Sequence, residues 1–356
     1  MMHLRWKHLA IGLAVLPFVV LLSTWIGFFN VGASTGHWKI TEWFLHFAMR
    51  SAVRTYALAV DAPDPLPKEG IQPAAGHFAR GCAICHGAPG EPRSPAALAM
   101  LPQPPDLSRV VGQWEDAELF RIVKHGVRFT GMPAWPTQAR DDEVWSMVAF
   151  LRKLPTMEGT AYRALAYGDR PAPPMKPSRF DEALAECTRC HGADGMGYSP
   201  LTPVLAGQKE GYLVESLNAY LERQRPSGMM QLSVQATDRA LLPDLARHFA
   251  SLPRQKVLGT AKDERVREGE QIARQGRPAL KVPACLGCHQ DAARNPLYPV
   301  LAGQPQAYLA RQLLLFREGS RSGRPFSHLM VSAAEHLSDA DIERVSAYFS
   351  ILPRED

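Results

Sequence analysis

The longest uncharged apolar segment of the chain runs from Leu9 to Phe29, a length of 21 residues. As a helix it would span about 31 Å at roughly 1.5 Å per residue, which matches a bilayer hydrocarbon core of about 30 Å. Arg5 and Lys7 precede it, and basic flanks keep that end of a span in the cytoplasm. The pattern predicts a cytoplasmic tip and transmembrane anchor over residues 1–33. A cleaved signal peptide is the alternative, although the segment exceeds a signal h-region of about 7 to 15 residues.

Apolar residues recur at helical spacing just after the anchor, at Ile40, Trp43, Phe44 and Phe47. This spacing predicts an amphipathic helix within residues 34–62. Such a helix lies either at the membrane surface or against the domain that follows, and the sequence leaves both placements open.

Three later segments share a helical period, an acidic first residue and a stop at Leu-Pro. They begin at Asp141, Asp238 and Asp339 and stop at Pro155, Pro253 and Pro353. An internal repeat accompanies them, because Pro203–Gln208 recurs 96 positions later as Pro299–Gln304. The pattern predicts successive domains over residues 63–170, 171–260 and 261–356. The proline-rich stretch 171–177 has the composition of a stiff linker between the first two.

Composition narrows the class of protein. The chain is 46% hydrophobic and 21% charged, the balance of an ordered globular protein, which excludes wholesale disorder. Its 40 Lys+Arg exceed its 35 Asp+Glu by only five and form no basic tract, so nucleic acid is not an expected partner.

Each of the six cysteines belongs to a Cys-x-x-Cys pair that a histidine follows directly. The three motifs are Cys82-Ala-Ile-Cys85-His86, Cys187-Thr-Arg-Cys190-His191 and Cys285-Leu-Gly-Cys288-His289. This is the signature of c-type haem attachment, in which two thiols bind the haem vinyl groups and the adjacent histidine ligates the iron. A zinc ribbon needs four-ligand sites and a thioredoxin-type pair needs a βαβ context, and neither explains the histidines. The sequence therefore predicts three covalently attached haem c groups.

With these motifs, the chain after about residue 70 resembles the class I c-type cytochromes in three successive domains. The resemblance implies an all-α fold, with three tandem class I cytochrome c domains after one N-terminal transmembrane helix. It also implies that each closing helix packs across the helix that precedes the first haem cysteine. Phe78 and Phe180 are the residues expected in that contact.

In this family a proline carbonyl after the haem motif accepts a hydrogen bond from the iron-ligating histidine and fixes its orientation. Pro203 and Pro299 match that role in the second and third domains. In the first domain Pro104 or Pro105 would have to serve, at a longer spacing.

The family usually completes the iron site with a methionine some tens of residues after the histidine. Met132 stands in a Gly-Met-Pro segment like the family's ligand loop, whereas Met100 has the surroundings of a packing residue. Met330 is the one methionine after Met230. The closing segments of the second and third domains lie 100 positions apart, which maps Met330 onto Met230 and favours it over Met229. The rival ligands are His125, His248, His328 and His336.

The resemblance implies electron transport. We expect a single-pass protein of the bacterial inner membrane with its haem domains in the periplasm and no catalytic residue of its own. It would pass electrons from a partner dehydrogenase through three His/Met haems to quinone, a soluble cytochrome or a terminal oxidase. Two alternatives stay open: a subunit that delivers electrons to a haem-copper terminal oxidase, and a multi-haem peroxidase-type enzyme. The second needs an open iron position, which a methionine in each domain disfavours.

Overall fold

The computed structural model describes residues 6–32, 35–168, 176–253, 263–289, 295–321 and 324–353. Within these ranges the secondary structure is helical, and pairing of the β type is limited to two isolated bridges, Ala88 with Glu91 and Arg277 with Val282. The predicted all-α class is therefore confirmed. The expected domain boundaries near residues 33, 170 and 260, and most of the linker 171–177, lie outside the described residues.

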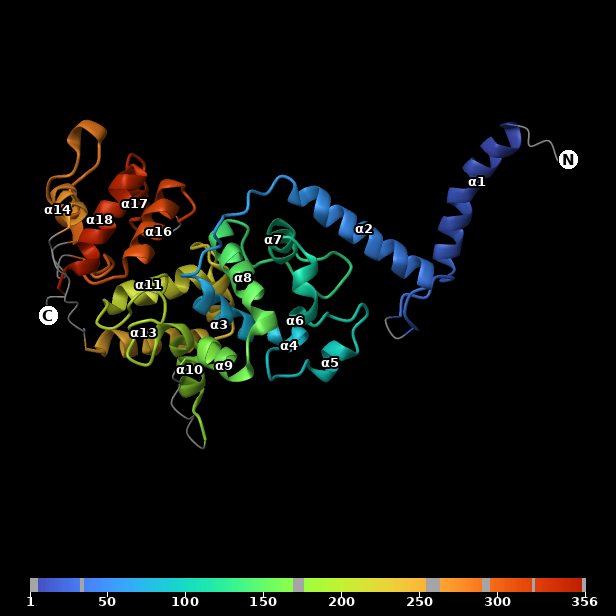
Figure 1. The fold of residues 1–356 in the computed structure, drawn as a ribbon, viewed down its shortest axis with the longest axis horizontal. Coiled ribbons are helices and arrows are strands. Elements are labelled where there is room, and N and C mark those ends of the chain that lie inside the picture. The colour runs from blue at the N-terminus through green and yellow to red at the C-terminus, as the bar shows by residue number, and fades with distance from the viewer. Residues whose placement is uncertain are drawn as a thin grey trace.

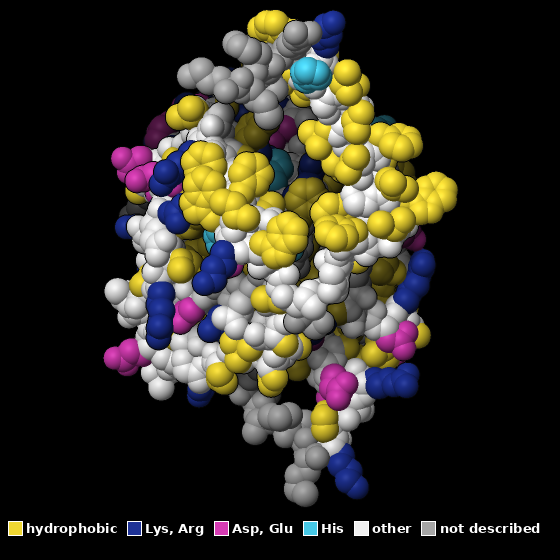
Figure 2. Space-filling model, turned by 90° about the vertical axis from the view of Figure 1, so that its right-hand side faces the viewer, with side chains coloured by type: hydrophobic (Ala, Val, Ile, Leu, Met, Phe, Trp, Pro, Cys, Tyr) yellow, Lys and Arg dark blue, Asp and Glu magenta, His cyan; other side chains and the backbone are white. Residues whose placement is uncertain are grey.

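Two long helices lead into the body of the molecule (Figure 1). Helix α1 (Trp6–Trp25) is long and apolar enough to cross a membrane, and α2 (Lys39–Ala57) follows it. The C-terminal half of α2 packs on the first domain, where the Arg50 guanidinium lies 4.9 Å from the Trp114 ring. The expected apolar face of its N-terminal half remains exposed. The predicted packing on the domain that follows is thus confirmed for the C-terminal half of α2, and the membrane-surface placement of the N-terminal half stays a prediction. Figure 2 shows hydrophobic side chains gathered on this side of the molecule.

The first domain is built around a core in which Phe78, Phe150 and Tyr162 are fully buried. Its helices are α3 (Ile71–Gly81), α4 (Ala83–His86), α5 (Pro95–Leu98), α6 (Leu107–Val110), α7 (Asp116–His125), α8 (Asp141–Lys153) and α9 (Gly159–Tyr167). The rings of Phe78 on α3 and Phe150 on the closing helix α8 lie 5.1 Å apart, which confirms the expected crossing. Helix α9 was not predicted, because it is short and follows the stop at Pro155. It packs on α3 and α10.

The second and third domains repeat one arrangement of helices. The second contains α10 (Arg179–His191), α11 (Glu210–Leu221), α12 (Gly228–Gln235) and α13 (Leu242–Ser251). The third contains α14 (Glu264–Gln275), α15 (Leu286–His289), α16 (Gln306–Arg317), α17 (Ser327–Ala334) and α18 (Asp339–Ile351). Phe180 lies in the predicted contact, 6.0 Å from the His248 ring of the closing helix α13. That helix is preceded by a 3-10 turn over Arg239–Leu241, so the α-helix begins later than Asp238 predicts.

The repeated six-residue segment joins the second and third domains. The Gln208 side chain donates to the Val300 carbonyl at 3.0 Å and accepts from the Val300 amide at 2.9 Å. The Gln304 side chain makes the same pair of bonds to Val204, at 2.8 and 3.0 Å. Each repeat therefore recognises the backbone of the other, and a common hydrogen-bonding pattern holds the two domains side by side.

Candidate haem sites

All three Cys-x-x-Cys-His motifs lie on or beside a helical turn. The first occupies α4 and the residue before it, the second ends α10, and the third occupies α15 and the residue before it. Cysteines three positions apart in a helix share one face, so both thiols of a pair can reach one planar group. All six thiols are free of disulfides.

The histidine of each motif is oriented by a proline carbonyl. The Nδ1 atom of His191 lies 3.2 Å from the carbonyl of Pro203, and that of His289 lies 3.1 Å from the carbonyl of Pro299. In the first domain the corresponding distance from His86 is 2.9 Å, and the partner is Pro105, not Pro104. These contacts confirm the expected proline partners. With a proton on Nδ1, each ring presents the lone pair of Nε2 to a metal ion.

Burial holds these histidines in the neutral form that ligates iron. Burial lowers the pKa of His191 to about 4, and the hydrogen bond to Pro203 only partly opposes this shift. Burial also lowers the pKa values of His86 and His289 from their ordinary value, again against a proline carbonyl. Near neutral pH the three imidazoles are therefore unprotonated at Nε2.

The methionines of the second and third domains differ in where they pack. Met230 lies with Phe180 and Cys187 in the core of the second domain, while its neighbour Met229 packs on the core of the first. Met330 packs in the third-domain core beside Cys285. This division supports the choice of Met230 over Met229 as the candidate ligand.

The first domain leaves its methionine assignment a prediction. Met132 lies in the loop between α7 and α8 and is partly exposed. The terminal methyl of Met100 lies against Gly131, the residue that precedes Met132. Among the described contacts, none joins Met132 to His86.

The rival histidines occupy other surroundings. His125, His328 and His336 are exposed. His248 lies between aromatic rings, 6.0 Å from Phe180 and 5.3 Å from Phe249.

One cavity of about 690 Å³ joins the candidate sites of the second and third domains. Its walls include the cysteines, histidine and candidate methionine of both domains: Cys187, Cys190, His191, Met230, Cys285, Cys288, His289 and Met330. Residues of α3 and α8 from the first domain close part of it. A separate cavity of about 510 Å³ lies beside His86. Two of the three candidate sites thus share a common interior.

Buried arginines line the shared cavity in a pattern that the sequence analysis missed. Arg225 donates to the Tyr308 hydroxyl at 3.3 Å, and Arg321 donates to the Tyr212 hydroxyl at 3.1 Å. Arg324 donates to the Ser216 hydroxyl at 3.0 Å. The repeat offset of 96 relates Arg225 to Arg321, so it was the signal that could have identified them.

The arginines leave an excess of positive charge inside the protein. Burial opposes ionisation of Tyr212, but the charges of Arg225, Arg321 and Arg324 outweigh burial and hold the pKa of Tyr212 well below its ordinary value. In the part of the chain that the structure describes, no carboxylate pairs with these three arginines. Buried cations without such partners are costly, so this cavity favours a group that brings anionic oxygens. Haem c has two carboxylate side chains, and with the free thiols and neutral imidazoles the residues present fit it.

Comparison with known proteins agrees with this fit. Residues 69–151 match the family described as cytochrome C oxidase, cbb3-type, subunit III. Cytochrome c4 of Pseudomonas aeruginosa is 38% identical over 169 residues, which cover 46% of this chain and 82% of that protein. The thiosulfate dehydrogenase electron acceptor of Thiomonas intermedia is 33% identical over 174 residues, 48% of this chain and 79% of that one. The crystal structure of reduced cytochrome c4 from Pseudomonas stutzeri aligns at 33% identity and a TM-score of 0.43, covering 48% of this chain and 97% of that chain. These relatives each cover about half of the chain.

Proposed function

The chain belongs to the class I c-type cytochromes, and we propose that it is a membrane-anchored periplasmic electron carrier with three haem c groups. The observation that carries the proposal is the threefold recurrence of the attachment motif together with its histidine-to-proline hydrogen bond. Each domain thereby offers two thiols and one oriented neutral imidazole. Met230 and Met330 line the cavity that holds their histidines, and Met132 is the methionine proposed for the first domain.

When bound, the haem groups supply the one-electron chemistry. The residues of this chain hold and tune them. His86, His191 and His289 would ligate the irons from one side, and Met132, Met230 and Met330 from the other. A closed pair of protein ligands leaves no position for substrate, and methionine raises the reduction potential relative to a second histidine. The buried arginines that line the shared cavity would favour the reduced state of a bound haem further, because their positive charge disfavours the extra positive charge of an oxidised iron.

The shared cavity suggests the order of transfer. Electrons would pass directly between the second and third haem groups, because both sites open into the same interior. The first domain packs on the second through α3, where a side chain at Gly76 would lie within 2.9 Å of the Cys190 sulfur. The second domain is therefore the packing neighbour that α3 of the first domain offers for such transfer.

The N-terminal helices would place the protein on the periplasmic face of the inner membrane. Helix α1 has the length and apolarity of a span. The exposed apolar face of α2, where the Trp43 and Phe47 rings stack at 5.7 Å, would then lie at the membrane surface. The attached domains would then stay close to membrane-bound partners.

Among donors we favour a periplasmic dehydrogenase, because two relatives are named as electron acceptors of thiosulfate dehydrogenase. Solubilised membranes should yield this chain together with a dehydrogenase, and adding the substrate of that enzyme should reduce the haem groups. Delivery of electrons to a terminal oxidase is the second candidate, favoured by the family matched over residues 69–151. Recovery of a haem-copper oxidase in place of a dehydrogenase would select it.

The deciding measurement is made on the purified full chain. A pyridine haemochrome assay should give three haem c groups per chain, and the oxidised protein should show a methionine-to-iron band from each. A high-spin haem, or a count below three, would refute the carrier with three closed sites. The first of these results would favour the peroxidase-type enzyme.

A further inference from the structure

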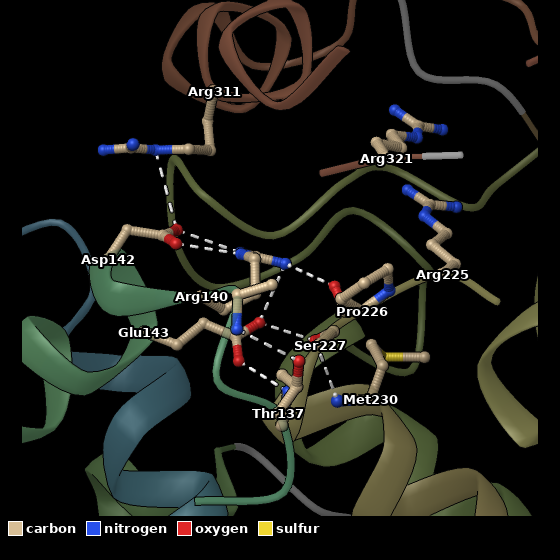
Figure 3. Close-up of polar contacts among 12 residues, drawn as sticks. Thr137, Arg140, Asp142, Glu143, Arg225, Pro226, Ser227, Met230, Arg311 and Arg321 are labelled. Carbon is tan, nitrogen blue, oxygen red and sulfur yellow. Dashed lines mark hydrogen bonds and ion pairs between the residues drawn. The ribbon is translucent and has the colours of Figure 1, made fainter. Parts of the chain in front are cut away.

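The closing helix of the first domain begins in a buried polar cluster that reaches into the second domain. The carboxylate of Glu143, in the first turn of α8, is only 5% exposed. Four donors converge on its two oxygens: the Ser227 hydroxyl at 2.6 Å, the Gly228 amide at 2.6 Å, the Arg140 guanidinium at 3.0 Å and the Trp135 indole at 3.3 Å. Figure 3 shows this convergence from both domains.

The two residues that Glu143 holds in the second domain begin the helix that carries Met230. Ser227 is the N-cap of α12, and its hydroxyl accepts from the Met230 amide at 3.2 Å. Because the same hydroxyl donates to Glu143, a continuous hydrogen-bond chain runs from the first-domain carboxylate to the backbone of Met230 (Figure 3). An N-cap fixes the first helical turn, which here includes Met230.

Close packing reinforces the same junction. The Trp135 indole lies on Gly228, and any side chain at that position would overlap the ring. Trp135 follows Met132 by three residues, so the candidate ligand segments of the first and second domains touch at this point. Arg140 adds a further link, since it donates to the Pro226 carbonyl at 3.1 Å.

The cluster is also tied to the third domain. Asp142 binds Arg140 through two bonds of 2.9 Å and lies 3.6 Å from Arg311 of α16. All three domains therefore meet around Arg140 and Asp142, as Figure 3 shows.

We propose that Glu143 of the first domain is a positioning residue for the Met230 ligand segment of the second. By holding Ser227 and Gly228 from outside the second domain, it fixes how far Met230 stands from the iron, and it thereby sets the reduction potential of the second haem. The first domain thus tunes its neighbour as well as carrying its own haem. This inference rests on the proposed function, because it takes Met230 as an iron ligand.

The test compares Glu143→Gln and Ser227→Ala in the full anchored chain by redox titration and by the methionine-to-iron band. We expect the reduction potential of one haem, the second, to fall and the methionine-to-iron band to weaken. The loss of band intensity should not exceed the loss that Met230→Ala causes. Glu143→Asp, which keeps the charge, should restore part of the loss.

A matched control is Asp341→Asn. Asp341 is the buried carboxylate at the equivalent place in α18, where it pairs with Arg277 at 2.8 Å, and it does not reach the Met230 segment. It should lower stability and leave the second haem unchanged. If Glu143→Gln and Ser227→Ala shift no potential beyond this control while Met230→Ala does, the positioning role is refuted and the carrier stands. If Met230→Ala itself leaves the band intact, the ligand assignment in the proposed function fails.

Discussion

Replacing Gln304 by Leu should separate the second and third domains. The change keeps the volume of the side chain and removes both hydrogen bonds to Val204. Each bond contributes about 0.5 to 1.5 kcal/mol, and the Val204 amide and carbonyl, buried at an interface where Gln304 is only 5% exposed, lose their partner at about 1 to 3 kcal/mol. We expect a loss of about 2 to 6 kcal/mol in the free energy of unfolding. Gln208→Leu should behave alike, and the double variant should lose less than the sum, because both residues hold one interface.

Urea unfolding with two probes separates this effect from the rest of the molecule. All seven tryptophans precede residue 146, so tryptophan fluorescence reports the first domain and the N-terminal helices. Circular dichroism reports all helices. The variant should shift the circular dichroism transition to lower urea and move the fluorescence transition little. Gln306→Leu is the control, since among the described contacts that side chain bonds to the exposed Glu343 alone, at 3.1 Å, and the change should alter stability by less than about 0.5 kcal/mol. Equal effects of the Gln304 and Gln306 variants would refute the reasoning.

Three further predictions concern the haem sites and the core. Met230→Ala should remove the methionine-to-iron band of one haem and lower its potential, whereas Met229→Ala should keep the band and destabilise the first domain; the near-infrared spectrum distinguishes them. Burial lowers the pKa of His77 to about 4 from 6.5, so below pH 6.5 the unfolded chain takes up a proton that the folded protein does not. The free energy of unfolding should therefore fall by up to about 3 kcal/mol as the pH falls from 6.5 toward 4. His77→Gln should flatten the pH dependence of melting over that range. Arg321→Gln should lower the potential of at least one haem, since it removes a positive charge from the shared cavity, and a redox titration that shows unchanged potentials would contradict this.

The parts of the fold that the sequence predicted depend on local patterns. The attachment motifs, the closing helices at Asp141 and Asp339, and the proline partners Pro203 and Pro299 each follow from a few neighbouring residues. In each case the spacing of these few residues is enough to indicate the local structure that they form. Helix α13 begins at Leu242 and not at the predicted Asp238, because a 3-10 turn lies between them.

What could not be predicted arises where domains meet. Glu143 belongs to an ordinary acidic first turn, and nothing in its neighbourhood indicates that its partners are Ser227 and Gly228. The glutamines of the repeat were visible in the sequence, but a repeat does not reveal that its copies face each other. Such contacts join positions about 85 to 100 residues apart, and they depend on how the finished domains dock.

The reciprocal pairing of Gln208 with Val300 and of Gln304 with Val204 has a consequence for assembly. A contact in which two like surfaces satisfy each other is isologous, and it closes after two members. Neither repeat has a binding edge left for a third copy, so the array cannot grow by the same contact. The first domain carries Pro104-Pro105-Asp106-Leu107 in place of the paired segment. It attaches to the second domain through α3 and α9 and through Glu143 of α8. The second and third domains therefore form a closed pseudo-dimer, to which the first domain is attached by a different contact, and the molecule is not an open-ended chain of equal units.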